Sequence, residues 1–216
     1  MIVLRAFSAL LSYPRNELLQ ALPELADVIR ASPLVAPRER KDLLALIDEL
    51  SRGDLLEMEE RYVELFDRGR ATSLNLFEHL HGEGRERGDA MVELKRVYER
   101  AGFELSTREL PDYLPVVLEY VSCRDLAETK DILSDCAHIL KKLAAALLAR
   151  NSAYAAVLQA LLVITGEEIV DAVSLPPASE RPETLDRDWF EEPAFAGAPI
   201  ATSPRPDVAH STASKP

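Results

Sequence analysis

The longest apolar stretch of the chain is AYAAVLQALLVIT, residues 153–165. One polar residue, Gln159, interrupts it, and the stretch falls short of the roughly 20 apolar residues that a membrane-spanning helix needs. A helix that is apolar on nearly all sides is typical of a protein core. We therefore expect residues 153–165 to form a buried core helix.

Helical spacing of apolar residues extends outward from this stretch over almost the whole chain up to about Val173. No segment shows the sustained alternation of a half-buried strand. The pattern predicts an all-α body, a single bundle of roughly six or more helices over residues 1–173. One long stripe runs from Leu126 to Leu147 through Cys136, which places this cysteine among core positions.

The last 43 residues, 174–216, differ in composition from the body. They hold eight of the 14 prolines, and apolar periodicity disappears. Such a segment cannot bury enough apolar surface to offset its conformational entropy, so we expect a largely disordered tail. Within it, Trp189, Phe190 and Phe195 are aromatic residues in a polar setting. They are typical of a short docking motif, or else they fold back over an apolar patch of the bundle.

Charge and cysteine content exclude several classes of protein. The formal net charge of −12 repels phosphate backbones and anionic membranes, which excludes nucleic acid and membrane partners and favours a basic one. A chain with 47% hydrophobic residues and two cysteines does not need a disulfide to fold. Because no export signal is evident at the N-terminus, we expect a cytoplasmic protein.

The most concentrated polar segment is FEHLHGEGRERG, residues 77–88. Its side chains Glu78, His79, His81 and Glu83 are metal-ligand types, so a metal or cofactor carrier is one hypothesis. Because neither cysteine is near in sequence, a capped loop between helices is the favoured interpretation, with no metal and no cofactor. An enzyme built on Cys123 or Cys136 with His138 is a further alternative, although inert core cysteines fit the pattern better.

A second interruption of the helical pattern is RELPDYLP, residues 108–115. Asp112 is placed to cap the following helix, which is a structural role. The alternative is a peptide-recognition site, because acidic and apolar side chains together suit an amphipathic peptide that carries Lys or Arg. The candidate binding residues are Glu109, Asp112, Tyr113, Leu114, Glu119 and Tyr120.

Three segments together carry a family resemblance: YVELFDRGR at 62–70, LNLFEHLHGEGRERG at 74–88 and ELPDYLP at 109–115. In order and spacing, over roughly residues 4–173, the chain resembles the NarJ family of the TorD, DmsD and NarJ superfamily. The residues of the second segment that we single out are Glu78, His79, His81, Glu83, Arg85 and Arg87.

The resemblance implies an all-helical, system-specific chaperone that catalyses no reaction. Such proteins bind the N-terminal segment of the apo α subunit of a respiratory nitrate reductase in the cytoplasm. They assist insertion of the molybdenum cofactor and an iron–sulfur cluster, and they delay docking onto the membrane subunit. The superfamily's E-x-x-D-H motif is matched by Glu109 and Asp112, whereas Tyr113 replaces the histidine, so only the two acidic residues carry over.

Overall fold

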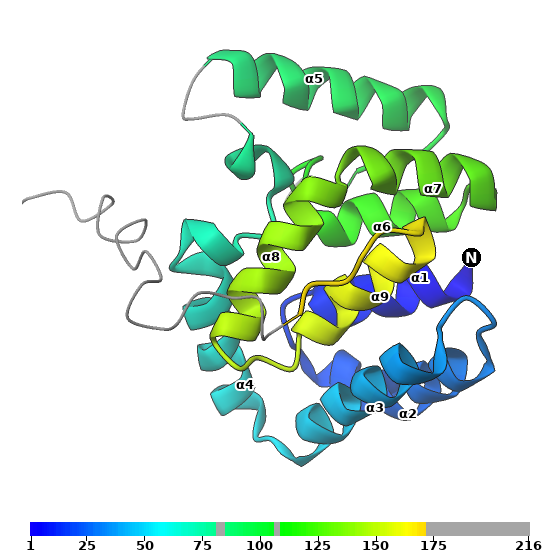
Figure 1. Cartoon of the computed structure of the whole chain (residues 1–216). Coiled ribbons are helices and arrows are strands. Elements are labelled where there is room, and N and C mark those ends of the chain that lie inside the picture. The colour runs from blue at the N-terminus through cyan, green and yellow to red at the C-terminus, as the bar shows by residue number, and fades with distance from the viewer. Residues whose placement is uncertain (81–84, 106–108, 172–216) are drawn as a thin grey trace, which may run out of the picture.

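The computed structural model describes residues 1–80, 85–105 and 109–171, and nine α-helices run through this part of the chain (Figure 1). They are α1 Ile2–Leu11, α2 Asn16–Ala31, α3 Pro37–Arg52, α4 Leu55–Tyr62, α5 Arg85–Arg100, α6 Leu114–Ser122, α7 Leu126–Asp135, α8 Ala137–Ala149 and α9 Ala155–Thr165. A π-helix, Val63–Asp67, and two 3-10 turns, Arg70–Thr72 and Leu76–His79, lie between α4 and α5. No strand occurs among these residues, so the all-α prediction is confirmed.

Helix α9 lies at the centre of the bundle, where it packs against α8, α3 and α7 (Figure 1). Its side chains Val157, Leu158, Leu161 and Leu162 are completely buried. Burying one such side chain contributes about 1.5–3 kcal/mol. The core helix expected from the apolar stretch is therefore confirmed. The polar interruption, Gln159, turns its carboxamide toward the backbone of Val170.

Helices α1 and α6 form the closest helix pair in the bundle. On α1, the side chains of Leu4, Phe7 and Leu10 are completely buried. A buried hydroxyl fixes the pair in register, because Ser8 Oγ donates to the carbonyl oxygen of Pro115 at 2.8 Å. Segments more than 100 residues apart in sequence are thereby joined.

The hairpin of α2 and α3 covers α9 from the other side (Figure 1). Helix α3 begins at Pro37, whose missing N–H costs nothing in the first helical position, and it ends at the C-cap Gly53. Asp54 then caps α4, since its carboxylate accepts from the backbone N–H of Leu56 at 2.9 Å. These start and stop signals were readable in the sequence.

The predicted stripe from Leu126 to Leu147 is divided between two helices. Helix α7 ends at Asp135 and α8 begins at Ala137, with Cys136 as the residue between them. Apolar spacing continues across the break because Leu133 and Ala137 both face the core. Cys136, which was expected among core positions, is half-buried at the junction and packs against the core.

Helix α5 lies along the outer edge of the molecule (Figure 1). Among the described helices it lacks close backbone packing against any other. Its anchor is Tyr98, which is buried against Phe103 and Tyr120 and donates from its hydroxyl to the carbonyl oxygen of Pro111 at 2.9 Å. Gly102, at a φ of +73°, ends the segment in the left-handed region that favours glycine.

A search of the described residues finds no helix with the length and apolarity required to span a bilayer.

Candidate functional site

Two of the segments that carry the resemblance lie side by side and pair through their backbones. The N–H of Leu76 donates to the carbonyl oxygen of Asp112 at 3.0 Å, and the N–H of Leu114 donates to the carbonyl oxygen of Leu74 at 2.8 Å. Asn75 and Tyr113 form an antiparallel bridge between these two bonds. We call residues 73–80 and 109–114 the paired loops.

Asp112 holds the paired loops together from the inside. Its side chain is fully buried, and Oδ2 accepts from the backbone N–H of Phe77 at 2.9 Å. The sequence prediction that Asp112 caps the next helix is wrong, because α6 begins at Leu114 with Tyr113 as its N-cap residue. The carboxylate instead satisfies a backbone donor 35 residues earlier in the chain.

Burial dominates the electrostatics of Asp112. Removal from water raises the pKa of its carboxyl group, while the hydrogen bond from Phe77 acts in the opposite direction. Its second oxygen, Oδ1, has no hydrogen-bond partner within the described part of the chain. Asp112 is thus a structural acid enclosed by the paired loops, and it offers no oxygen to the surface.

Arg70 and Thr72 hydrogen-bond to the backbone before and within the first of the paired loops. The Arg70 guanidinium donates from Nε to the carbonyl oxygen of Glu78 at 2.8 Å, with a second bond from Nη2 to the same oxygen. The Thr72 hydroxyl donates to the carbonyl oxygen of Leu65. Both side chains therefore close local backbone turns, as a capped interhelical loop requires.

Glu78 connects the same loop to α5. Its carboxylate pairs with the guanidinium of Arg87 at 3.0 Å, and both side chains are about three-quarters buried. Next to it, His79 Nε2 forms a 2.8 Å hydrogen bond with the carbonyl oxygen of Ser73. Burial lowers the pKa of His79, although the bond to Ser73 partly offsets that shift. Both side chains already have protein partners.

The other members of the predicted metal set, His81 and Glu83, lie outside the described residues, and so does the side chain of Arg85. Within the residues that are described, no group of three or more His, Cys, Asp or Glu side chains is arranged to hold a metal ion.

Two tyrosines join the paired loops to the bundle. The Tyr62 and Tyr113 hydroxyls are 2.8 Å apart, and Tyr62 also donates to the carbonyl oxygen of Leu11 at 2.8 Å. Burial raises the pKa of both phenols, so both stay protonated donors at neutral pH. No local pattern in the sequence indicates this contact, because the two tyrosines are 51 residues apart.

The six residues proposed to bind a peptide fall into two groups. Asp112, Leu114 and Tyr120 are buried, so these three support the local structure, whereas Tyr113 is half-buried and keeps part of its surface accessible. Glu109 and Glu119 have exposed side chains. Sequence reasoning overlooked Leu80 and Leu110, which are exposed leucines on the paired loops. No sequence pattern distinguishes a single exposed leucine from a buried one.

The cysteines do not form a nucleophilic pair with His138. Both thiols are free, and burial raises the pKa of Cys136 to about 11, which disfavours the reactive thiolate. Cys123 is exposed, and its sulfur lies 3.7 Å from the hydroxyl of Ser122. No described hydrogen bond links either sulfur to the imidazole of His138, which is exposed on α8.

The fold and the paired loops define an all-helical protein whose most distinctive polar side chains hold backbone segments in place. A family profile described as the nitrate reductase delta subunit matches residues 15–160. The chain belongs to this nitrate reductase delta subunit family, and the resemblance to NarJ is confirmed.

Named relatives cover most of the chain. It is 41% identical over 197 residues to the nitrate reductase molybdenum cofactor assembly chaperone NarJ of Escherichia coli. The aligned region covers 89% of this chain and 84% of the relative. The probable chaperone NarW of the same bacterium is 36% identical over 195 residues, covering 88% and 81% of the two chains. The probable NarJ of Bacillus subtilis is 33% identical over 162 residues, covering 74% and 86%.

Proposed function

We propose that this chain is a cytoplasmic chaperone dedicated to a respiratory nitrate reductase. It binds the N-terminal segment of the apo α subunit, assists insertion of the molybdenum cofactor and the iron–sulfur cluster, and delays docking onto the membrane subunit. It catalyses no reaction and carries no resident cofactor. The printed names of its relatives, which are assembly chaperones for this enzyme's molybdenum cofactor, support the choice of client.

The observation that carries the peptide-binding part is the set of exposed apolar side chains on α5 and on the paired loops. Eight large hydrophobic side chains of the described chain are exposed, and four of them, Leu80, Val92, Val97 and Leu110, belong to α5 or to the paired loops. Pro111, the residue after Leu110, is bonded to Tyr98 of α5, which brings the second loop to this helix. Exposed apolar side chains of this kind favour an interaction site on these elements.

Charge near this apolar surface favours a basic, amphipathic peptide. Glu109 is exposed beside Leu110, and the whole chain carries a net charge of −12. The glutamates of α5 do not add to this preference, because Glu93 and Glu99 pair with basic residues of the same helix. We assign direct contact with the peptide to Glu109 and Tyr113, and to Glu119 on α6. Asp112, Leu114 and Tyr120 then act as supporting residues that set the positions of the exposed ones.

Isothermal titration of the full chain with a synthetic peptide of the α subunit N-terminus tests this function. We expect saturable binding that weakens by about tenfold in Val92→Asp and Val97→Asp, since each places a desolvated carboxylate in an apolar contact. Leu56→Asp is the matched control because Leu56 is equally apolar, 63% exposed, and lies on α4. Absence of heat at high peptide concentration, or equal weakening by the control, contradicts the proposal.

The tail residues Trp189, Phe190 and Phe195 lie outside the described residues. We propose that they form a docking motif for the maturation machinery or cover an apolar patch of the bundle. Replacing all three with alanine separates the two roles. Loss of nitrate reductase maturation with an unchanged melting temperature supports docking, whereas a lowered melting temperature supports the covering role.

A further inference from the structure

Three tyrosines from distant parts of the chain meet just after the end of α1. The ring of Tyr13 contacts that of Tyr62 edge to face, with the centroids 5.5 Å apart, and the Tyr62 hydroxyl lies 2.8 Å from that of Tyr113. Tyr62 is buried, whereas Tyr13 is 39% exposed and Tyr113 is half-buried. Tyr13 and Tyr113 therefore present accessible surface around a shared buried partner, and we call the three residues the tyrosine group.

The π-helix Val63–Asp67 begins directly after the buried member of the tyrosine group. Its turn is wide, since the N–H of Arg68 donates to the carbonyl oxygen of Val63 at 3.1 Å, five residues back. The π-helix buries Leu65 and Phe66 and ends at Asp67, which is exposed. Short π-helical turns are rare, and they frequently occur at functional sites. This one brings a carboxylate to the edge of the tyrosine group.

Two carboxylates border the accessible tyrosines. Burial is the main cause of the raised pKa of Tyr113, and the negative charges of Asp67 and Glu109 raise it further. Asp67 acts in the same direction on Tyr62. Because such effects are strong only at short range, both carboxylates lie near these hydroxyls. Partial removal from water also raises the pKa of Asp67 itself. Within the described part of the chain, no side chain pairs with Asp67 or Glu109.

Accessible tyrosine rings bordered by carboxylates suit a cationic side chain. A guanidinium or an ammonium group packs on an aromatic face and pairs with a carboxylate at the same time. The exposed Leu110 is close by, because the N–H of Tyr113 donates to its carbonyl oxygen at 3.1 Å. One stretch of surface therefore offers partners for a basic and an apolar residue of the same peptide.

We propose that Tyr13, Tyr113 and Asp67 bind an arginine or lysine side chain of the α subunit's N-terminal segment, with Glu109 at the edge of the contact. The inference rests on the proposed function and deepens it. It adds two residues that neither the sequence nor the exposed apolar side chains indicated, Tyr13 and Asp67, and it names the kind of side chain that they bind. The net charge of −12 favours such a partner.

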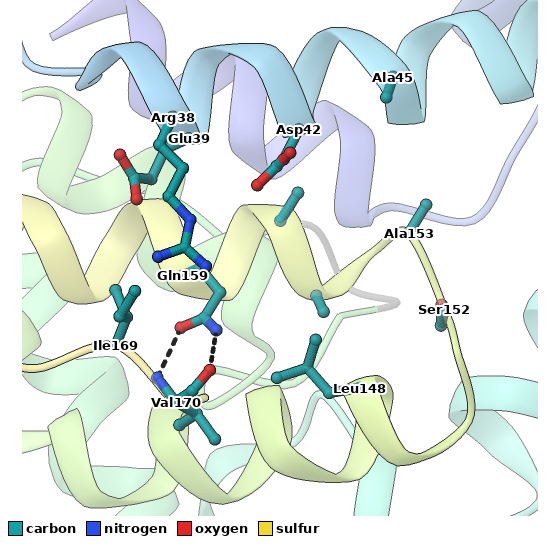
Figure 2. A pocket seen from close by; sticks show the side chains of 12 residues that line it. Arg38, Glu39, Asp42, Ala45, Leu148, Ser152, Ala153, Gln159, Ile169 and Val170 are labelled. Carbon is teal, nitrogen blue, oxygen red and sulfur yellow. Dashed lines mark hydrogen bonds between the residues drawn. The ribbon is translucent and has the colours of Figure 1, made fainter. Parts of the chain in front are cut away.

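The chain's own residues 172–216 are a poorer occupant of this surface. They carry seven Asp or Glu against four Lys or Arg, so their net charge repels the two carboxylates. The segment before them is held at α9, where the carboxamide of Gln159 bonds to both backbone groups of Val170 at 3.0 and 2.6 Å (Figure 2).

Isothermal titration of the full chain with the synthetic peptide of the α subunit N-terminus tests the charge contact. We expect Asp67→Asn to weaken binding about fivefold, since it removes the charge and keeps the shape. Glu64→Gln is the matched control, because Glu64 is an exposed carboxylate of the same π-helix. Replacing the basic residues of the peptide one at a time by glutamine should yield one peptide that Asp67→Asn and the wild type bind equally. Equal affinity of Asp67→Asn and Glu64→Gln, or weakening by Asp67→Asn that persists with every substituted peptide, overturns the inference.

The aromatic contact is tested at Tyr13. Tyr13→Ala should weaken binding about tenfold, and Tyr13→Phe should restore most of the affinity because it keeps the ring. Since Tyr13 also packs on Tyr62, a photo-crosslinking residue, p-benzoylphenylalanine, is placed at position 13 as a second measurement. It should capture the peptide, whereas the same residue at Leu56, which is 63% exposed on α4, should not. Equal capture at both positions, or none at position 13, contradicts the contact.

Failure of this inference is distinguishable from failure of the proposed function. If the wild type binds the peptide and Val92→Asp weakens binding, while Asp67→Asn and Tyr13→Ala bind as the wild type does, only the contact at the tyrosine group is rejected. Absence of binding to the wild type rejects the proposed function, and the contact with it.

Discussion

Helix α9 and helix α5 are held in the bundle in opposite ways. Eight of the eleven residues of α9 are buried, and neighbouring helices surround it. Helix α5 is longer, with 16 residues, but its single fully buried side chain is that of Tyr98. Near the other end, α5 is fastened to the paired loops through Arg87 and Glu78. Helix α9 therefore places most of its side chains in the core, whereas α5 keeps Val92 and Val97 exposed.

This difference separates a helix that serves the core from a helix whose apolar side chains are partly exposed. A helix that is fully packed has no surface left for a partner. Helix α5, anchored by one aromatic residue and one ion pair, keeps Val92 and Val97 exposed to the peptide that we propose it binds. The comparison predicts separable effects of mutations in the two regions.

The largest expected effect is the loss of core packing in α9. Leu161→Ala removes a completely buried side chain and leaves a cavity, so we expect a loss of about 2–5 kcal/mol in the free energy of unfolding. Val92→Ala on α5, where the residue is 51% exposed, should change it by less than about 0.5 kcal/mol. Urea denaturation measures both. Similar losses for the two variants would remove the distinction between the regions.

Breaking the paired loops comes next in size. Asp112→Ala leaves the backbone N–H of Phe77 buried without an acceptor, which should cost about 1–3 kcal/mol. Asp112→Asn keeps a side-chain oxygen in place and should cost less. Hydrogen exchange at the Phe77 amide, together with urea denaturation, distinguishes the variants. If both destabilise equally and exchange at Phe77 is unchanged, Asp112 does not hold the loops.

A smaller effect is expected where the loops meet α5. Arg87→Gln removes the ion pair with Glu78, and we expect a loss of about 0.5–1 kcal/mol with faster amide exchange in the first turns of α5. Arg96→Gln is the control on the same helix, because its pair with Glu93 is largely exposed. Uniform exchange rates along α5 in both variants would show that Glu78 does not fasten this helix.

The smallest expected effect is a dependence of stability on pH from His79. Burial lowers its pKa in the folded state, so its contribution is present above the unfolded pKa of about 6.5 and is lost as the pH falls through the folded value. Between pH ~7.5 and ~5.5, the wild type should lose about 1–2 °C more in melting temperature than His79→Gln does. His138→Gln, at an exposed site on α8, should behave like the wild type. A parallel decrease in all three proteins contradicts the assignment.

Local signals predicted a good part of the fold. Pro37, Gly53 and Asp54 marked helix boundaries because their backbone preferences act within one or two residues. The sequence was less informative where two helices share one apolar stripe. The break at Cys136 leaves the spacing of Leu133 and Ala137 intact, so periodicity alone could not reveal it.

The candidate site was predicted only in outline. The segments around Glu78 and Asp112 were recognisable as unusual, but a sequence cannot show that Asp112 accepts from Phe77 across 35 residues. It also cannot show that Glu78 pairs with Arg87 of α5 in a largely buried contact. Such features depend on which elements pack together, and that follows from the sum of many distant contacts.

By itself, the sequence determined the all-α class, the buried helix near the end of the described chain and the family, because helical periodicity and short motifs are local properties. Only the tertiary structure decided that Asp112 joins two loops and that Val92 and Val97 of α5 stay exposed. Burial and hydrogen-bond partners are properties of the packed chain, since solvent exclusion at one residue depends on every segment around it.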